Sequence, residues 1–376
     1  MRIVVCPDSF KGSLSAIQVA TIIKNAFHEV DETIIVDCVP IADGGEGTID
    51  AFSASIGGEL RVVIVQNPMM ERIEAGYLVL PDGTCVIEMA QSTGLHLVKE
   101  ELRNPLVATS YGMGEMVRHA LDAGGRKFVV GIGGSATNDG GYGLLRALGM
   151  RFFDEHGKEL AEDVLALQKL AHIDTSEFDE RISESTWDIA CDVDNPLLGE
   201  NGATLVFGPQ KGVTKDIHMQ LEQALAQLSE VVAKQVGNAV HEVPGAGAAG
   251  GVGMALLAYF PATLKRGIDV VSTTTGLAEK IARADYVITG EGYSDRQTLN
   301  GKAPLGIAKL AKEQQIPVAL LSGKVAGGSI HALHSHFTII MAAADEQMST
   351  AFAMDNAEDL LFAKAKKLAQ QLRETL

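Results

Sequence analysis

Glycine is the feature of this sequence that most restricts its fold, because it gathers in a few loops instead of being spread along the chain. There are 40 glycines among 376 residues, about 11% where ~7% is usual. The densest clusters lie at 44–47, 131–143, 244–253 and 290–292, and each follows an apolar, strand-like run or precedes a helix-like one. Loops at the carboxyl ends of strands in α/β proteins have this pattern, and ligands bind there. The sequence therefore predicts an α/β fold with glycine-rich binding loops.

Charge and hydrophobicity narrow the class of protein. The chain has 31 Lys and Arg against 48 Asp and Glu, a net charge of −17, and 46% of its residues are hydrophobic. Such a chain folds around a core, and its negative field disfavours nucleic acid and anionic membranes as partners. No apolar run approaches the roughly 18 residues that a membrane span needs. We expect a soluble protein, a monomer or a homodimer, whose partners are small molecules.

The cysteines indicate the compartment. Cys6, Cys38, Cys85 and Cys191 have no CxxC spacing, so neither a disulfide framework nor a structural zinc site is indicated. The N-terminus enters a strand-like run at once, without the pattern of a signal peptide. The sequence predicts reduced thiols and a cytoplasmic location.

The order of strand-like and helix-like runs predicts two domains. Near the N-terminus strands alternate with helices, which is typical of a parallel sheet. The runs at 60–65, 73–80 and 85–89 are instead successive strands, with a hairpin turn at 81–83, and the alternation returns after residue 277. We predict a discontinuous α/β domain at 1–62 plus 268–376, an inserted mixed α/β domain at 63–267, and an active site in the cleft between them.

Several elements are predicted individually. The run at 203–207 is expected to be a strand and the segment from Thr214 to about Val236 a long helix. The final helix is expected to begin at Asp355, with Glu358 as its capping-box partner.

Two glycine loops match the dinucleotide-binding fingerprint on paper. They are GAGAAG at 245–250 and GIGGSA at 131–136. Pro244 precedes the first, where a strand should end. The second is followed by Asp139, whose carboxylate would repel a pyrophosphate unless a divalent cation lay between them. The alternative is that these glycines only permit tight turns and close packing.

Acids and lysines accompany glycines in the other loops as well. Mg²⁺-dependent phosphate chemistry requires this combination, because lysines and backbone amides bind phosphate oxygens while carboxylates serve the metal and act as a base. No Walker sequence GxxxxGK[ST] is present, so the P-loop class is not supported. The loops carry Asp8 and Lys11; Asp43 and Glu46; Asp192 and Asp194; Glu291 and Asp295, with Arg296 and Lys302 nearby.

Six motifs in order give the sequence a family resemblance. They are PDSFKGSLSA, PIADGGEGT, GIGGSATNDGG, FGPQKG, PGAGAAGGVG and TGEGYSDRQTLNGKAP. Together they resemble the bacterial class I glycerate kinase family (glycerate 2-kinase type). The resemblance implies two α/β domains: a discontinuous flavodoxin- or Rossmann-like parallel-sheet domain and the inserted mixed α/β domain. One departure is Tyr293, which stands where the family has a basic residue after GEG, and Arg296 carries the nearest positive charge.

The resemblance implies an enzyme that transfers the γ-phosphoryl group of ATP to D-glycerate with Mg²⁺. The acceptor hydroxyl stays open, with 2-phosphoglycerate favoured by analogy, and so does the choice between carboxylates as base or metal ligand. Lys211 is a further candidate for anion binding. We assign catalytic roles to Lys11, Asp43, Asp192 and Asp295; ATP or phosphate binding to Gly133, Gly134, Ser135, Thr137, Asn138, Gly247 and Gly250; substrate binding to Asp8, Ser9, Arg296 and Lys302; and metal binding to Asp43 and Glu46.

Two other classes of function remain as alternatives. One is an NAD-dependent oxidoreductase of a small hydroxy acid that uses one of the GxGxxG-like loops. The other is a non-catalytic sensor of glycerate or of a nucleotide with the same fold.

Overall fold

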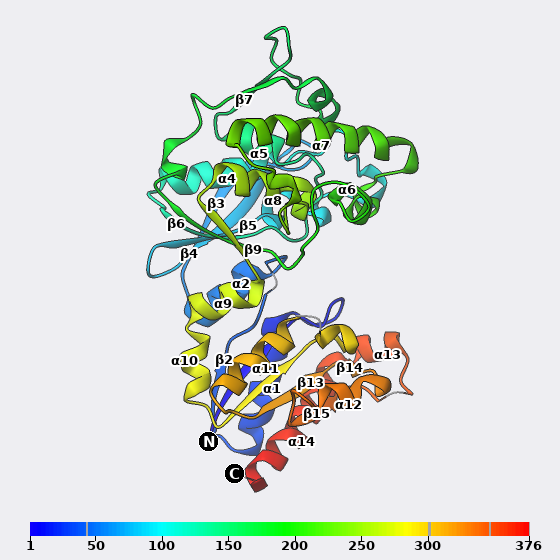
Figure 1. Cartoon of the computed structure of the whole chain (residues 1–376). Coiled ribbons are helices and arrows are strands. Elements are labelled where there is room, and N and C mark those ends of the chain that lie inside the picture. Colours follow the sequence, from blue (N-terminus) through cyan, green and yellow to red (C-terminus); the bar gives the residue numbers. More distant parts are fainter. Residues whose placement is uncertain (43, 300–301, 346, 376) are drawn as a thin grey trace. The chain divides into compact units, whose positions relative to one another are not determined.

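The structure is a computed structural model that describes residues 1–42, 44–299, 302–345 and 347–375 (Figure 1). Contacts between Cα atoms divide these residues into two compact units. Unit 1 contains 1–42, 50–57 and the described residues from 267 onwards, and unit 2 contains 44–49 and 58–266. The short segment 44–49 therefore belongs to unit 2 by its contacts, although it follows a strand of unit 1.

Unit 1 is built on a five-stranded sheet in which every pair of neighbours is parallel. The strands, in spatial order, are β2 (Ile35–Cys38), β1 (Arg2–Pro7), β11 (Tyr286–Gly290), β13 (Val318–Ser322) and β15 (Ile339–Ala342). Numbered by their sequence within the unit, they follow the order 2-1-3-4-5, which is that of flavodoxin-like sheets. The predicted fold class is confirmed.

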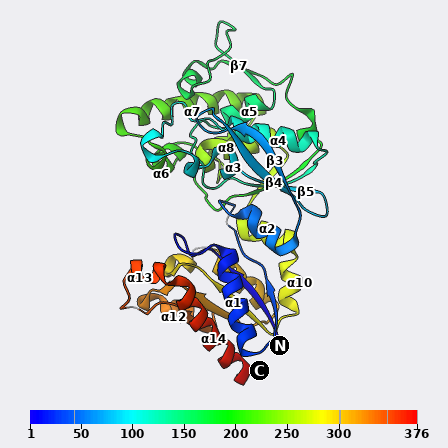
Figure 2. The same cartoon turned by 180° about the vertical axis from the view of Figure 1, so that it is seen from behind.

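Helices cover both faces of this sheet. On one face α1 (Ala16–Val30) and α14 (Ala357–Thr375) lie side by side (Figure 2) and share a buried core with Ile3 and Val5 of β1. On the other face α11 (Ala303–Glu313) contacts β11 and β13. The remaining elements of this unit and its boundary are α2 (Thr48–Ile56), α9 (Gly267–Thr275), α10 (Leu277–Ala282), β12 (Tyr293–Ser294), β14 (Lys324–Val325), α12 (Ile330–Leu333) and α13 (Thr350–Asp355).

The predicted start of the final helix is wrong. Asp355 is the last residue of α13, and α14 begins at Ala357. The side chain of Ser349 accepts a hydrogen bond from the Phe352 N–H and so begins α13 one and a half turns earlier. A capping-box pattern in the sequence marks a helix start only where no stronger cap precedes it.

Unit 2 is built on a six-stranded mixed sheet. Its strands, in spatial order, are β10 (Ala262–Lys265), β9 (Thr186–Ala190), β6 (Lys127–Gly131), β5 (Thr84–Glu88), β4 (Arg72–Val79) and β3 (Glu59–Gln66). The first four are parallel, and β4 and β3 complete the sheet in antiparallel pairing. The antiparallel hairpins predicted at 60–89 are confirmed. A separate antiparallel pair is formed by β7 (Arg151–Phe153) and β8 (His172–Asp174).

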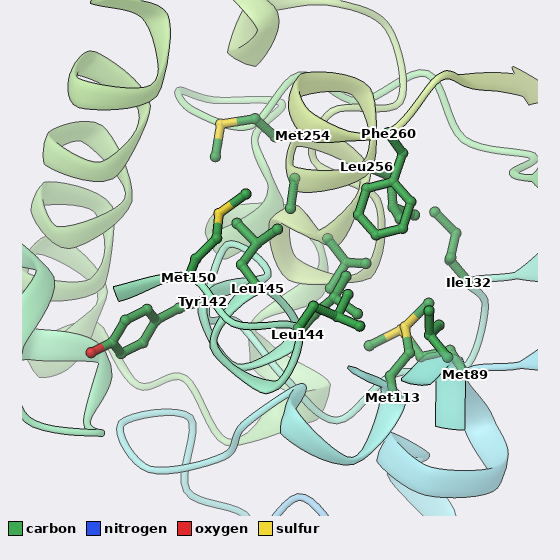
Figure 3. Packing of buried hydrophobic residues seen from close by; sticks show 14 of the residues in the cluster. Met89, Met113, Ile132, Tyr142, Leu144, Leu145, Met150, Met254, Leu256 and Phe260 are labelled. Carbon is green, nitrogen blue, oxygen red and sulfur yellow. The ribbon is translucent and has the colours of Figure 1, made fainter. Parts of the chain in front are cut away.

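The helices of unit 2 enclose its main core. They are α3 (Ala90–Thr93), α4 (Tyr111–Asp122), α5 (Tyr142–Ala147), α6 (Ala203–Phe207), α7 (Lys215–Val236) and α8 (Ala248–Tyr259). Figure 3 shows Leu145 of α5 beside Met150, and Leu144 of α5 on the side of the cluster that holds Met113 of α4. The long helix predicted from Thr214 is confirmed as α7.

The strand predicted over 203–207 is wrong, because this segment is the short helix α6. A five-residue apolar run has no periodicity that separates a buried strand from a helix. The tertiary contacts decide here, since α6 packs on α8 and leaves Leu205 and Val206 exposed. In the described part of the chain, no helix combines the length and apolar character needed to span a bilayer.

Candidate active site

In unit 1 the carboxyl ends of β1 and β11 bring two of the predicted loops together. The next strand in the sequence, β2, lies on one side of β1, and the later strands β11, β13 and β15 lie on the other. In open α/β sheets ligands bind at such a switch point, outside the carboxyl ends of the strands. The Asp8 N–H donates to the Gly290 carbonyl at 2.9 Å. A Cβ on Gly292 would lie 3.2 Å from the Cα of Phe10, closer than an ordinary van der Waals contact. The loops 8–12 and 290–294 are therefore in direct contact.

The polar side chains of this edge differ in their partners. Lys11 and Arg296 are exposed, and neither makes an ion pair or side-chain hydrogen bond with another described residue. The Ser9 N–H donates to Oδ1 of Asp8 at 2.6 Å. Oδ1 of Asp295 accepts from the Gln297 N–H at 2.7 Å. The two exposed cations are therefore free to meet an anion from solution.

Lys302, by contrast, already has a counter-charge. Its Nζ lies 2.9 Å from Oε2 of Glu291. Glu291 is only 6% exposed and also accepts from the hydroxyls of Thr298 at 2.5 Å and Ser294 at 3.1 Å. A buried carboxylate with this many donors ties the segment from β11 to α11 together. The charge of Lys302 is thus partly offset within the protein.

In unit 2 the carboxyl ends of β5, β6 and β9 gather three further loops. The Gly133 N–H donates to the Gly44 carbonyl at 3.0 Å. A Cβ on Gly44 would lie 2.7 Å from the carbonyl oxygen of Ala190, at the end of β9. The glycines predicted to line a binding site therefore hold segments 44–49, 131–141 and 191–196 in close contact.

Glu88 is a residue of this site that sequence reasoning missed. It ends β5, is completely buried, and accepts hydrogen bonds from the N–H groups of Gly47 at 3.0 Å and Ile49 at 3.2 Å. Its carboxylate anchors the segment 44–49 to the sheet of unit 2. One pattern in the sequence could have indicated it: Glu88 lies within the apolar run VIEM. A carboxylate buried in such a run needs hydrogen-bond donors, and a nearby loop can supply them.

The predicted acidic ligands and bases of unit 2 lie on these loops. Asp43 lies outside the described residues. Glu46 is exposed on the segment anchored by Glu88, and Asp192 is exposed just after β9. In the ranges that the structure describes, no three His, Cys, Asp or Glu side chains form a group that could hold a metal ion.

Several of the predicted phosphate-binding side chains lie on the loop after β6, and they are buried. Ser135, Thr137 and Asn138 are at most 6% exposed, and Gly134 is exposed at the rim. Lys211, in the 3₁₀ turn Pro209–Lys211, lies beneath this loop with its Nζ donating to Oγ of Ser135 at 2.8 Å and to the Thr137 carbonyl at 2.6 Å. Burial lowers the pKa of Lys211 from 10.5 to about 7, against the opposing effect of Asp139.

Asp139 has a structural role instead of facing a phosphate. Its carboxylate accepts hydrogen bonds from the N–H and hydroxyl of Ser110, both at 2.8 Å, and from the N–H groups of Gly141 and Gly143 at 3.1 Å. These bonds fix the start of α5 to α4. Four donors therefore hold the carboxylate of Asp139 in place at the start of α5.

Gly247 and Gly250 allow close packing of backbones. A Cβ on Gly247 would lie 2.1 Å from the Pro196 carbonyl oxygen, and one on Gly250 would lie 2.1 Å from that of Thr137. Residues 249–251 are all in the left-handed conformation. The stretch 245–250 follows the 3₁₀ turn Val240–Glu242 and not a strand, so it lacks the strand–loop–helix unit of a dinucleotide site.

Comparison with known proteins shows what these features belong to. The model of the Glycerate kinase family matches residues 3–373. A glycerate kinase of Halalkalibacterium halodurans is 41% identical, covering 98% of this chain and 97% of its own. A glycerate 2-kinase of Escherichia coli K12 is 44% identical, covering 89% of this chain and 88% of its own. A crystal structure of a protein named glycerate kinase 2 from Salmonella typhimurium LT2 superposes with a TM-score of 0.88 at 41% identity, covering 100% of this chain and 99% of that one.

The family match and the fold together make this chain an α/β phosphotransferase with two compact units. The chain belongs to the glycerate kinase family, and it is a kinase. The resemblance drawn from the six motifs is confirmed.

Proposed function

We propose that this enzyme transfers the γ-phosphoryl group of ATP to the 2-hydroxyl of D-glycerate. The proposal rests on the family and on the relative named glycerate 2-kinase. The alignment with that relative covers 89% of this chain at 44% sequence identity. In the reaction an oxygen–phosphorus bond forms on glycerate, the bond between the γ-phosphorus and ADP breaks, and the hydroxyl proton passes to a carboxylate. The products are 2-phosphoglycerate and ADP.

The observation that carries the proposal is the buried lysine, Lys211, under the loop after β6. Phosphoryl transfer depends mainly on positioning and on charge stabilisation, because the transition state spreads negative charge over the phosphoryl oxygens. Lys211 places an amino group that can carry a positive charge against Ser135 and Thr137, at the carboxyl edge of a parallel part of the sheet. We assign the ATP phosphates to this loop, with Gly133, Gly134 and Asn138 alongside, and attribute a packing role to Gly247 and Gly250.

The carboxylate of glycerate is assigned to the switch point of unit 1. Lys11 and Arg296 are exposed there without a partner among the described residues, and Asp8 and Ser9 precede Lys11 on the same loop. In a chain of net charge −17, a substrate anion needs such a local positive spot. Lys302 contributes less, because Glu291 already balances it.

Mg²⁺ fits this enzyme as a metal that is carried mainly by the nucleotide. Mg²⁺ in kinases is usually held by one or two carboxylates together with substrate phosphates. The described acids Glu46 and Asp192 are exposed, which suits that mode of binding. We assign metal binding to Glu46 with Asp43, and the role of base to Asp192 or Asp295. When bound, the ion neutralises phosphate charge.

The test is a coupled assay of ADP release with D-glycerate, followed by phosphorus NMR of the product. We expect ADP release that depends on D-glycerate and a phosphorus signal split by the single proton on C2. A signal split by the two protons on C3 would move the reaction to the 3-hydroxyl. No ADP release with D-glycerate would refute the proposed function.

A further inference from the structure

Lys211 is buried without a carboxylate partner. It is 2% exposed, and within the described residues no acid lies at ion-pair distance from its Nζ. Its two hydrogen bonds go to neutral oxygens, the hydroxyl of Ser135 and the carbonyl of Thr137. A neutral amine can donate both of these bonds, since it loses only one of the three donors of an ammonium group. The pocket around Nζ therefore accommodates the uncharged form.

The side chains next to Lys211 have hydrogen-bonding capacity to spare. Oγ1 of Thr137 and Oδ1 of Asn138 are buried and have no partner in the described part of the chain. The Nδ2 of Asn138 donates to the hydroxyl of Thr204 at 3.1 Å. Buried polar atoms nearly always have partners. The amide oxygen of Asn138 can only accept a hydrogen bond, whereas the unpaired hydroxyl of Thr137 can donate one to a phosphate oxygen.

The charged groups around Lys211 are few. Asp139 is the acid that acts on it electrostatically, and its oxygens are engaged by the backbone of α5 and by Ser110. The guanidinium of Arg103 donates to the carbonyl of Gln210, next in the chain to Lys211. The helix α6, which packs on this turn, has no titratable side chain. No other charge in these elements balances an ammonium group at this position.

We propose that Lys211 is a positioning residue that takes up one proton from solvent when a phosphate group of ATP binds to the loop 133–138. The anion supplies the counter-charge that the buried amine lacks, so the ammonium form becomes favourable only in the complex. The positive charge strengthens the two hydrogen bonds to Ser135 and Thr137 and attracts the phosphate, which holds the loop around it. This inference rests on the proposed function, because it requires ATP at this loop.

The coupling has a defined pH dependence. Because burial lowers the pKa of Lys211 to about 7, its amine is largely unprotonated in the free enzyme near pH 8. The phosphates of ATP are already fully ionised at that pH. Binding must then draw a proton from the buffer, and the Kd of MgATP should rise about tenfold per pH unit above pH 7. Below pH 7 the Kd should lose this dependence.

Calorimetric titration with MgATP near pH 8, without glycerate, measures the proton directly. Two buffers with different enthalpies of ionisation, HEPES and Tris, give the number of protons taken up, and we expect close to one for the wild-type chain. In Lys211→Arg the uptake should vanish while binding is kept, because a guanidinium is always charged. In Lys211→Met the uptake should vanish and the Kd should rise at least tenfold. Lys215→Met, which removes an exposed lysine four residues away, should behave as wild type.

The outcomes separate this inference from the proposed function. Wild-type binding of MgATP without proton uptake overturns the coupling and leaves the kinase activity standing. Uptake that persists in Lys211→Arg assigns the proton to another group and also overturns it. If Lys211→Met does not fold, as checked by its thermal melt, the wild-type and Lys211→Arg titrations still decide. Absence of both MgATP binding and glycerate-dependent ADP release refutes the proposed function itself.

Discussion

At the scale of single residues, the charged side chains of the site divide into those that the protein has already paired and those that it has left for a ligand. Glu291 pairs with Lys302, and Asp139 with backbone N–H groups. Lys11 and Arg296 face solvent without a partner among the described residues. Lys211 is buried and has no acid at ion-pair distance in the part of the chain that the structure describes. The unpaired cations are therefore the residues on which substitutions should act most selectively on activity.

The first prediction concerns Lys11. Lys11→Ala should lower kcat/KM by roughly 10²–10³, the typical effect of removing one preorganised group that stabilises charge. The thermal melt should be unchanged, because the side chain is exposed and buries little apolar area. Lys309→Ala, an exposed lysine on α11, is the control and should keep full activity. A Lys11→Ala enzyme within about twofold of wild type would remove Lys11 from the site.

The second prediction concerns the stability of the enzyme without ATP. Burial lowers the pKa of Lys211 to about 7 from 10.5, so between these pH values the unfolded chain binds the extra proton. The free energy of unfolding should then rise with pH, by at most about 1.4 kcal/mol per unit in this window, from this residue. Denaturation curves at pH 7, 8 and 9 should show this slope in the wild type and in Lys215→Met, and a smaller slope in Lys211→Met. Equal slopes in all three would contradict a buried, neutralised Lys211.

At the scale of elements, loops at the ends of strands are held by two devices, glycines at close approaches and a few buried carboxylates. Gly44 and Gly133 let the segment 44–49 approach β6 and β9, and Glu88 then binds its N–H groups. In the same way the left-handed turn 249–251 lies against Thr137. The glycine clusters were predicted correctly as loops, but part of their role is to bring backbones together.

The third prediction separates packing from ligand binding at Gly250. Gly250→Ala adds a Cβ 2.1 Å from the Thr137 carbonyl oxygen at a residue with φ of +67°. Overpacking and left-handed strain together should destabilise the fold by about 3 kcal/mol. The matched control is Gly276→Ala, where φ is +63° but no atom lies within 4 Å, so only about 1 kcal/mol is expected. Denaturant curves measure both, and equal losses would refute a packing role for Gly250.

At the scale of the whole molecule, a polypeptide of net charge −17 must handle two anionic substrates. The exposed lysine and arginine of unit 1 and the buried lysine of unit 2 can supply local positive charge, but the exposed acids Glu46 and Asp192 lie on other predicted binding loops. A divalent cation brought with the nucleotide reconciles these acids with phosphate, because it offsets both.

The fourth prediction follows from this balance of charge. In excess EDTA the glycerate-dependent release of ADP should fall to background, and addition of Mg²⁺ beyond the chelator should restore it. The thermal melt of the free enzyme should not change in EDTA, since no metal group lies within the described residues. Full turnover in EDTA would remove the metal from the reaction and leave Glu46 without the assigned role.

The sequence by itself determined the α/β class, the order of most strands and helices, the glycine loops and the family. These properties depend on local patterns: β-branched runs, helical periodicity and turn residues restrict the backbone within a few residues of where they stand. The six motifs indicated the family, because six motifs in this order are specific to it whereas any single one is not.

Only the tertiary structure decided which charges are buried and what each one meets. Lys211 lies 76 positions from Ser135 in the chain, and Glu88 lies 41 positions from Gly47. The run at 203–207 became a helix because of its packing on α8. Burial and pairing depend on contacts between distant segments, and these contacts set the free energy of a charge through desolvation and hydrogen bonding. A lysine that looks like any other in the sequence therefore becomes, under the loop of unit 2, a group whose charge depends on its ligand.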